Sequence, residues 1–175
     1  MANNIILIGF MGVGKGRVAR ALVEKTGMMA IDTDDLIESM VNMKIRKIFK
    51  EHGEPYFREL EQKTADWLSR NVSNTIVSTG GGFFKVKGLG KKDTIVYLHS
   101  SLENIVNEML AHPKAKKKIR KRPLLQNMEK AAELFDERLP LYRKAADVEV
   151  NVEKAFPEEV AAKIIKKIER KKKKN

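Results

Sequence analysis

The stretch Ile5-Ile-Leu-Ile-Gly9-Phe-Met-Gly-Val-Gly14-Lys15 decides the fold. Its first four residues form an aliphatic run typical of a short buried strand, and the glycines that follow are typical of a tight turn. Apolar residues at helical spacing continue to Thr26, where Gly27 is suited to end a helix. In this strand–helix context, Gly9 to Lys15 matches the G-x-x-x-x-G-K part of a phosphate-binding loop. We therefore predict that backbone N–H groups and the helix dipole bind phosphate here, with Lys15 reaching the terminal phosphates.

The rest of the chain alternates short apolar runs with amphipathic segments. The predicted strands are Ile5–Ile8, Met28–Ile31, Thr75–Thr79, Thr94–Leu98 and Val148–Val152. The predicted helices are Lys15–Thr26, Leu36–Val41, Ile45–His52, Tyr56–Asn71, Leu102–Leu110, Met128–Leu139 and one that starts at Pro157, with a break at Gly53–Pro55. Continuous apolar strands separated by helices indicate a parallel sheet covered on both faces. We predict one α/β domain over residues 1–175, with three α/β/α layers and a central five-stranded parallel sheet.

The composition excludes several classes of protein. Hydrophobic residues at 42% and charged residues at 33% are typical of a folded domain rather than a disordered chain. The 175 residues include no cysteine, which excludes disulfide scaffolds, zinc fingers, thiol nucleophiles and iron–sulfur clusters. No apolar run approaches the ~20 residues that span a bilayer, and the first residues do not resemble a signal peptide. We expect a cytoplasmic protein with no membrane partner.

The net charge of +12 is concentrated in two short segments. Lys114–Arg122 carries seven basic residues and no acid, and Glu169–Asn175 carries a net charge of +4, which leaves +1 for the rest of the chain. Basic runs of this kind suggest a polyanionic partner, and one interpretation is a nucleic-acid-binding protein with a degenerate phosphate loop. Aromatic residues are only 6% of the chain and none interleaves with Lys114–Arg122, which disfavours a base-stacking surface. We expect no nucleic-acid partner.

One position departs from the usual phosphate loop. A Ser or Thr hydroxyl normally follows the lysine and binds Mg²⁺, whereas Gly16 and Arg17 follow Lys15 here. Two interpretations stay open: waters, Asp32 and the nucleotide hold the metal, or the affinity for the metal is reduced.

Two carboxylates follow the second predicted strand. Asp32 and Asp34 stand at its carboxyl end, where ligands of such sheets bind. Residues two apart in an extended segment face the same way, so both side chains can point into the site. The other interpretation is an acidic helix N-terminus, since Asp and Thr are good helix caps.

Six motifs occur in the order seen in shikimate kinases, and the resemblance covers the chain from Asn4 to about Ile168. They are Gly9-Phe-Met-Gly-Val-Gly-Lys15, Ile31-Asp-Thr-Asp-Asp35, Phe57-Arg58-Glu59-x-Glu61, Ser78-Thr-Gly-Gly-Gly82, Arg122-Pro-Leu-Leu125 and Glu137-Arg138-x-x-x-Tyr142. The resemblance implies a P-loop kinase fold with a mobile lid, at about residues 112–125, that closes over ATP. Residues 170–175 would form a basic C-terminal tail.

The resemblance also assigns roles to individual residues. ATP would be bound by Gly12, Val13, Gly14, Lys15, Gly16, Arg17, Arg122 and, beside the adenine, Lys154. Mg²⁺ would be held through water by Asp32 and Ser78. The substrate would contact Asp34, Arg58, Gly80, Gly81, Gly82 and Arg138, with Glu61 placed one helical turn after Arg58 to hold it. The catalytic residues would be Lys15, Asp34 and Arg122.

The activity implied is ATP-dependent phosphorylation of the 3-hydroxyl of shikimate, giving shikimate 3-phosphate and ADP in chorismate and aromatic amino-acid biosynthesis. Two guanidinium groups match a small carboxylic acid, because each can bind a carboxylate in bidentate fashion. The enzymatic alternative is another P-loop kinase, of the gluconate or nucleoside monophosphate type. We expect the protein to be a monomer whose partners are shikimate and ATP.

Overall fold

Five parallel strands form the centre of the computed structural model, which describes residues 3–90, 93–113 and 127–173. The strands are β1 (Ile5–Ile8), β2 (Met29–Asp32), β3 (Thr75–Ser78), β4 (Thr94–His99) and β5 (Val148–Asn151). They pair in the order β2-β3-β1-β4-β5. β1 and β3, at the centre, are buried along their whole length. This confirms the predicted sheet, in which apolar runs such as Ile5–Ile8 are covered on both faces.

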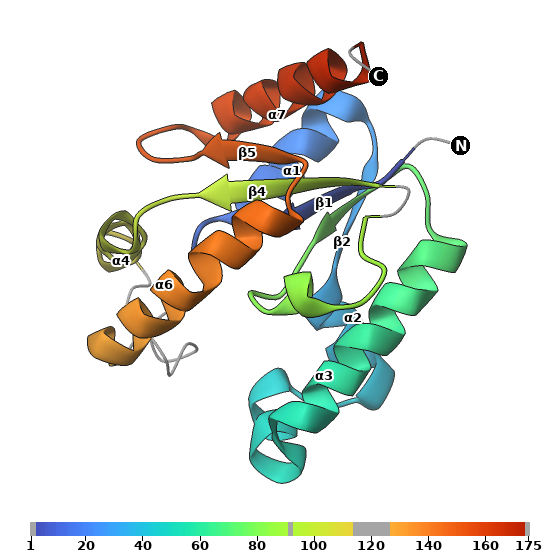
Figure 1. Cartoon of the computed structure of the whole chain (residues 1–175), viewed down its shortest axis with the longest axis vertical. Coiled ribbons are helices and arrows are strands. Elements are labelled where there is room, and N and C mark those ends of the chain that lie inside the picture. Colours follow the sequence, from blue (N-terminus) through green and yellow to red (C-terminus); the bar gives the residue numbers. More distant parts are fainter. Residues whose placement is uncertain (1–2, 91–92, 114–126, 174–175) are drawn as a thin grey trace.

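The helices cover the two faces of this sheet (Figure 1). They are α1 (Lys15–Thr26), α2 (Thr33–Val41), α3 (Ile45–Asn71), α4 (Leu102–Leu110), α6 (Met128–Ala145) and α7 (Pro157–Lys172), with a 3₁₀ turn, η1 (Phe83–Lys85). α1 and α7 pack together on one face, and α6 packs against β4 and η1 on the other. Among the described residues, no helix is long and apolar enough to span a bilayer.

α2 and α3 have a small core of their own beyond the β2 edge of the sheet (Figure 1). Its buried residues are Ile37, Ile48, Phe57 and Leu60. α3 is broken at Gly53, whose φ of 78° and ψ of 176° are non-helical, as the sequence predicts. The break lets the two parts of α3 run in different directions.

α6 is six residues longer than the sequence predicts, because Pro140 does not end it. Proline removes one helical hydrogen bond, and tertiary packing compensates for that loss here. Tyr142, in the added segment, is 1% exposed and stacks on Tyr97 with 5.1 Å between ring centroids. The last turn of α6 is therefore held against β4.

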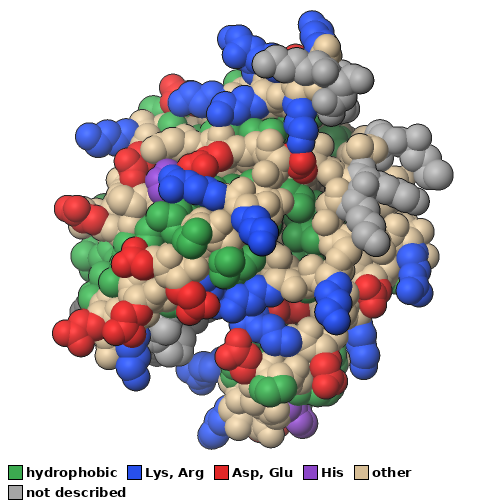
Figure 2. Space-filling model, in the orientation of Figure 1, with side chains coloured by type: hydrophobic (Ala, Val, Ile, Leu, Met, Phe, Trp, Pro, Cys, Tyr) green, Lys and Arg blue, Asp and Glu red, His purple; other side chains and the backbone are tan. Residues whose placement is uncertain are grey.

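The expectation of a basic tail over residues 170–175 is wrong for residues 170–172. Residues 170–172 belong to α7 and do not extend beyond it. Lys171 pairs with Asp147, and Lys167 Nζ donates a hydrogen bond of 2.7 Å to the Glu149 carbonyl. Part of the basic run is thus used to hold α7 to the start of β5. Elsewhere on the face seen in Figure 1, Figure 2 shows Lys and Arg side chains interspersed with Asp and Glu.

Candidate active site

The phosphate loop lies at the carboxyl end of β1 and leads directly into α1. Gly14, with φ 102°, caps α1 in a left-handed conformation that disfavours other residues. Lys15 is 9% exposed, and its Nζ donates hydrogen bonds to the carbonyls of Gly9 at 2.6 Å and Phe10 at 3.1 Å. The loop therefore holds its lysine close to the backbone, where an incoming phosphate would meet it.

A cavity of about 350 Å³ opens over this loop. It brings together the sequence-predicted residues Gly12, Gly14, Lys15, Gly16, Arg17, Asp32, Asp34, Ser78, Gly80 and Gly81. Val13 does not line it; this side chain is buried in the main core. Glu108 and Met109 of α4, to which the sequence analysis assigns no role, also line the cavity, as does His112 at the start of the expected lid. They lie next to the loop because β4, which precedes α4, pairs with β1.

Asp32, Asp34 and Ser78 meet on the wall of this cavity. Asp32 is the last residue of β2 and the N-cap of α2, and its Oδ1 accepts a hydrogen bond of 2.9 Å from the Asp34 N–H. Its Oδ2 accepts one of 2.7 Å from the Ser78 hydroxyl. Asp34 is therefore in the first turn of a helix, and the extended geometry predicted for Asp32–Asp34 is wrong. Both carboxylates still line the cavity, as the first interpretation predicts. Asp32 also caps the helix, as the second interpretation predicts.

The Asp34 carboxyl group has a strongly altered acidity. Burial, together with the neighbouring Asp32 charge, raises its pKa from 3.8 to about 6, while the Lys15 charge acts in the opposite direction. The Asp34 Oδ1 atom is buried and makes no hydrogen bond within the described residues. A buried carboxylate oxygen without a donor is costly, and it is the arrangement expected where a ligand hydroxyl completes the site.

Arg138 and Tyr142 of α6 converge on the glycine run after β3. Arg138 is 7% exposed, and its Nη1 donates to the Gly81 carbonyl at 3.1 Å. The Tyr142 hydroxyl donates to the same carbonyl at 2.5 Å, and burial raises its pKa to about 12. The Arg138 Nε atom is buried without a hydrogen bond in the described part of the chain. The sequence analysis includes Tyr142 in a motif but assigns it no role, although its spacing of four residues from Arg138 places both on one helix face.

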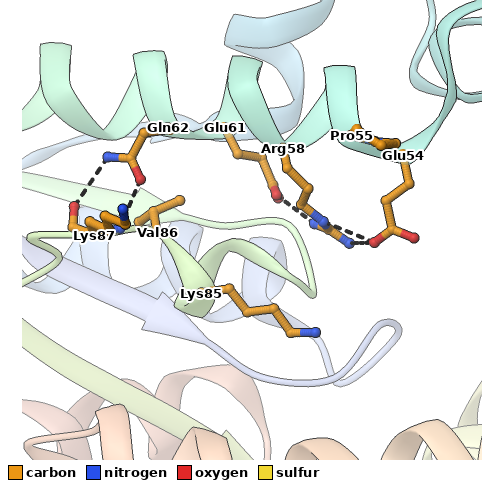
Figure 3. Close-up of a pocket in the computed structure, with 8 residues that line it drawn as sticks. All are labelled: Glu54, Pro55, Arg58, Glu61, Gln62, Lys85, Val86 and Lys87. Carbon is orange, nitrogen blue, oxygen red and sulfur yellow. Dashed lines mark hydrogen bonds and ion pairs between the residues drawn. The ribbon is translucent and has the colours of Figure 1, made fainter.

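Arg58 lies between two glutamates of α3, as Figure 3 shows. Its Nη1 donates to Glu61 Oε2 at 2.5 Å, while Nε and Nη2 donate to Glu54 Oε1 at 3.0 and 2.6 Å. The Glu61 side chain is 1% exposed and the Glu54 side chain 59%. Burial raises the pKa of Glu61, and Arg58 opposes that effect. The predicted Arg58–Glu61 pair is confirmed, but Glu54 was missed.

A second cavity, of about 500 Å³, is lined by residues of α3 on both sides of Arg58 and by the segment around η1 (Figure 3). Gln62 bridges the two elements by bonding the backbone of Lys87, and Lys85 points across the opening. Arg58 and Glu61 thus form part of the wall of this cavity, which makes the guanidinium reachable from solvent.

Two of the three glycines after β3 allow side chains to approach the backbone. A Cβ atom on Gly80 would lie 2.6 Å from Asp34 Oδ1, and one on Gly82 would lie 2.3 Å from Arg58 Nη1. Both distances are far below van der Waals contact. The glycine run therefore brings a carboxylate, two guanidinium groups and free backbone within reach of one small ligand.

The residues around Asp32 fit a hydrated magnesium ion. Mg²⁺ keeps several waters and is commonly bound through one or two carboxylates together with substrate phosphates. The described residues include no group of three or more acidic or histidine side chains placed as metal ligands. The Asp32 carboxylate and the Ser78 hydroxyl meet next to the phosphate loop. Together they offer oxygen atoms that can hydrogen-bond the waters of such an ion.

One predicted residue, Lys154, does not join this site. Lys154 is exposed in a turn with φ 54° and does not line either cavity. Its neighbour Glu153 instead fixes the turn, because its Oε1 accepts a hydrogen bond of 2.6 Å from the Ser101 N–H. Arg122 and the part of the expected lid from residue 114 to residue 125 lie outside the described residues.

Comparison with known proteins identifies the family. Residues 11–169 match the sequence model of the family described as shikimate kinase. The chain belongs to the shikimate kinase family. It is 39% identical over 172 residues to a shikimate kinase from Sulfurihydrogenibium sp., covering 95% of this chain and 98% of that protein. It is 38% identical over 174 residues to one from Thermodesulfovibrio yellowstonii, covering 95% of each. The resemblance drawn from the six sequence motifs is confirmed.

Solved structures agree with the family assignment. The shikimate kinase from Acinetobacter baumannii in complex with shikimate superposes with a TM-score of 0.82 at 30% identity, covering 98% of this chain and 96% of that chain. The one from Aquifex aeolicus superposes with a TM-score of 0.74 at 34% identity, covering 95% and 96%. The P-loop kinase fold expected from the motifs is therefore the observed one, and ATP with Mg²⁺ are the cofactors of the family.

Proposed function

We propose that this chain transfers the γ-phosphoryl group of ATP to the 3-hydroxyl of shikimate. The observation that carries the proposal is the meeting of Arg58 and Arg138 at the glycine run, next to the buried Asp34 and beside the phosphate loop. One end of this arrangement suits a carboxylate, the middle suits hydroxyl groups, and the far end suits phosphates. A small hydroxylated acid and a nucleoside triphosphate fit these three parts together.

The proposed clamp for the substrate carboxylate consists of Arg58, Arg138 and the Gly81 backbone. Arginine binds carboxylates in bidentate fashion, and two arginines fix both the position and the orientation of a small acid. Arg138 already lies on the Gly81 carbonyl, and its buried Nε is free of hydrogen bonds among the described residues. Tyr142 shares that carbonyl and so holds the same strand-end backbone in place. Gly80 and Gly82 leave room for the side chains of Asp34 and Arg58 to lie against the backbone beside this clamp.

Asp34 is proposed to orient the attacking hydroxyl and to accept its proton. A general base works best when its pKa lies near the working pH, and burial raises the pKa of Asp34 to about 6. Its unpartnered Oδ1 supplies the acceptor. In phosphoryl transfer the protein contributes mainly positioning and charge neutralisation, so placing this hydroxyl opposite the phosphate loop is the main task.

Lys15 and the loop are proposed to bind the β- and γ-phosphates. Lys15 Nζ now donates to carbonyls of its own loop, and it would exchange these for phosphate oxygens of higher charge. Bound Mg²⁺ supplies neutralisation of the charge that develops on the phosphates. Asp32 and Ser78 would hold its waters, because Gly16 offers no hydroxyl.

Several expectations remain proposals. Arg122 is proposed to reach the transferring phosphate when a lid at about residues 112–125 closes, and closure would exclude water from the reaction. We retain Lys154 beside the adenine only as a sequence-based prediction, since it is exposed outside the cavity. We also expect a cytoplasmic monomer without a nucleic-acid partner. Light scattering tests whether the protein is a monomer. A titration with RNA at ~0.15 M salt tests whether it binds nucleic acid, because purely electrostatic binding weakens steeply with added salt.

A coupled assay of ADP release tests the proposed function. We expect turnover with shikimate and little with gluconate or AMP, the substrates of the alternative P-loop kinases. Shikimate methyl ester is the matched control, because it keeps the three hydroxyls and lacks the carboxylate charge. Its KM should rise at least tenfold if the arginine clamp binds that charge. Absence of shikimate-dependent ADP release would contradict the proposal.

A further inference from the structure

A third acidic side chain, besides Asp32 and Asp34, lies beside the phosphate loop. Glu108 of α4 lines the 350 Å³ cavity over the phosphate loop. Its Oε2 accepts a hydrogen bond of 2.7 Å from Arg17 Nη2. The Glu108 side chain is 38% exposed and the Arg17 side chain 50%. A carboxylate at this place repels a nucleotide that carries three or four negative charges. Arg17 neutralises it in the ligand-free protein.

Arg17 is close to the backbone that receives the phosphates. A Cβ atom on Gly14 would lie 3.2 Å from Arg17 Nη2, so the guanidinium lies over the turn between the loop and α1. Arg17 is also the second residue after Lys15, in the first turn of the helix whose N-terminus points at the site. Its guanidinium thus has two competing anions within reach: the carboxylate of Glu108 and a phosphate of the nucleotide.

We propose that Arg17 is a phosphate ligand of the nucleotide, and that Glu108 holds it in the ligand-free protein and releases it when the nucleotide binds. This inference rests on the proposed function. A phosphate offers a higher charge than a carboxylate and a better-placed acceptor on the loop, while the Arg17–Glu108 pair is exposed and therefore weak. The exchange costs little, because the freed Glu108 is already partly in solvent.

Gly16 lacks the hydroxyl that normally contacts Mg²⁺ after the lysine of a phosphate loop. In a chain with Ser or Thr after the lysine, part of the phosphate charge is compensated through the bound metal. Here Gly16 has no hydroxyl, and the Arg17 guanidinium, one residue further on, supplies a positive charge to the phosphates without a metal ion. Binding of the nucleotide should therefore depend on Arg17 most strongly when Mg²⁺ is absent.

Calorimetric titration with ADP, in EDTA and in excess Mg²⁺, tests this without shikimate or turnover. Arg17→Thr should weaken ADP binding at least tenfold in EDTA, the typical effect of losing a charged hydrogen bond, and less in Mg²⁺. Glu108→Gln keeps the side-chain shape and its acceptor for Asn104, and it should strengthen ADP binding by up to about fivefold. Arg17→Lys, which keeps the charge without the planar fork, should be intermediate.

The matched controls are Arg143→Thr and Glu149→Gln. These residues form an exposed ion pair with side chains 49% and 37% exposed, almost equal to the Arg17–Glu108 pair, and neither lines the nucleotide cavity. They make the same changes in net charge, and ADP affinity should stay within twofold of wild type. Thermal melts of all the variants show that each is folded.

Two results would overturn the inference. If Arg17→Thr binds ADP in EDTA as tightly as Arg143→Thr, Arg17 is not a phosphate ligand. If Glu108→Gln binds ADP no more tightly than Glu149→Gln, Glu108 does not compete for Arg17. Shikimate-dependent ADP release, measured in parallel, separates these failures from failure of the proposed function, because ADP binding alone does not involve the acid substrate.

Discussion

Replacing Asp34 by asparagine should remove activity and stabilise the fold at the same time. Asp34 is held in a buried position where its ionised form is unfavourable, with Asp32 beside it and no hydrogen bond to Oδ1 among the described residues. Asparagine has nearly the same shape and no charge. If Asp34 is the base, its loss should lower kcat by about 10²–10⁴-fold, the usual contribution of a positioned base.

The stabilisation follows from the acidity of the carboxyl group. Its pKa is about 6 in the folded protein against an ordinary value of 3.8. At about 1.4 kcal/mol per pH unit, ionised Asp34 destabilises the folded state by about 3 kcal/mol above pH 6. The destabilisation is absent below pH 3.8, where the group is protonated in both states, and it grows between these two values. For a chain of this length, 3 kcal/mol raises the melting temperature by roughly 5–10 °C.

Calorimetric melts of wild type and Asp34→Asn at pH 4 and pH 8 measure this difference. The variant should melt well above wild type at pH 8 and close to it at pH 4. Asp35→Asn is the matched control, since Asp35 is the next residue along α2 and is exposed. A variant that melts at or below wild type at pH 8, or a gain of equal size at both pH values, would refute the reasoning.

Three further predictions concern the same site. The kcat/KM for shikimate should fall about tenfold per pH unit below pH 6, because Asp34 must be ionised to accept a proton; a flat profile down to pH 5 would contradict this. Gly82→Ala should raise the KM for shikimate at least tenfold and leave that for ATP unchanged, because the added Cβ would lie 2.3 Å from Arg58 Nη1. Gly16→Ser should lower the Mg²⁺ concentration needed for half-maximal activity, and it should fold, since the Cβ meets only Arg20 Nη1, at 3.9 Å. An unchanged Mg²⁺ requirement would show that the hydroxyl is not needed here.

Much of the fold could be predicted because local sequence and tertiary packing agree. β1, α1 and α4 have the predicted bounds, and the break in α3 lies at the predicted glycine. Disagreement occurs where long-range contacts outweigh a local signal. Pro140 is a strong helix breaker in sequence, yet the packing of Tyr142 on Tyr97 carries α6 past it. The last basic residues resemble a solvated tail in the sequence, yet Lys171 forms an ion pair with Asp147, which lies just before β5.

The candidate site was also predicted only in part from the sequence. Motif spacing located Asp32, Asp34, Arg58 and Arg138, because each stands at a fixed place after a strand or on a helix that the pattern defines. The predicted local geometry of Asp32–Asp34 was wrong. The Asp32 side chain caps α2, so the helix begins before the first residue of its apolar periodicity. The partners of the arginines could be predicted only when they lay on the same helix, as Glu61 does.

The exposure of those partners separates two kinds of contact that a motif cannot distinguish. Glu61 is 1% exposed, and removing the Arg58 charge would leave it buried without compensation, so this pair is permanent. Glu54 and Glu108 are 59% and 38% exposed, and each can return to water when its arginine takes another anion. Arg17 and Glu108 are 91 residues apart in sequence, a pairing that only the completed sheet brings about. In the ligand-free protein, then, exposed carboxylates occupy the arginines that the substrates are proposed to need, and binding becomes an exchange of anions with a small net cost.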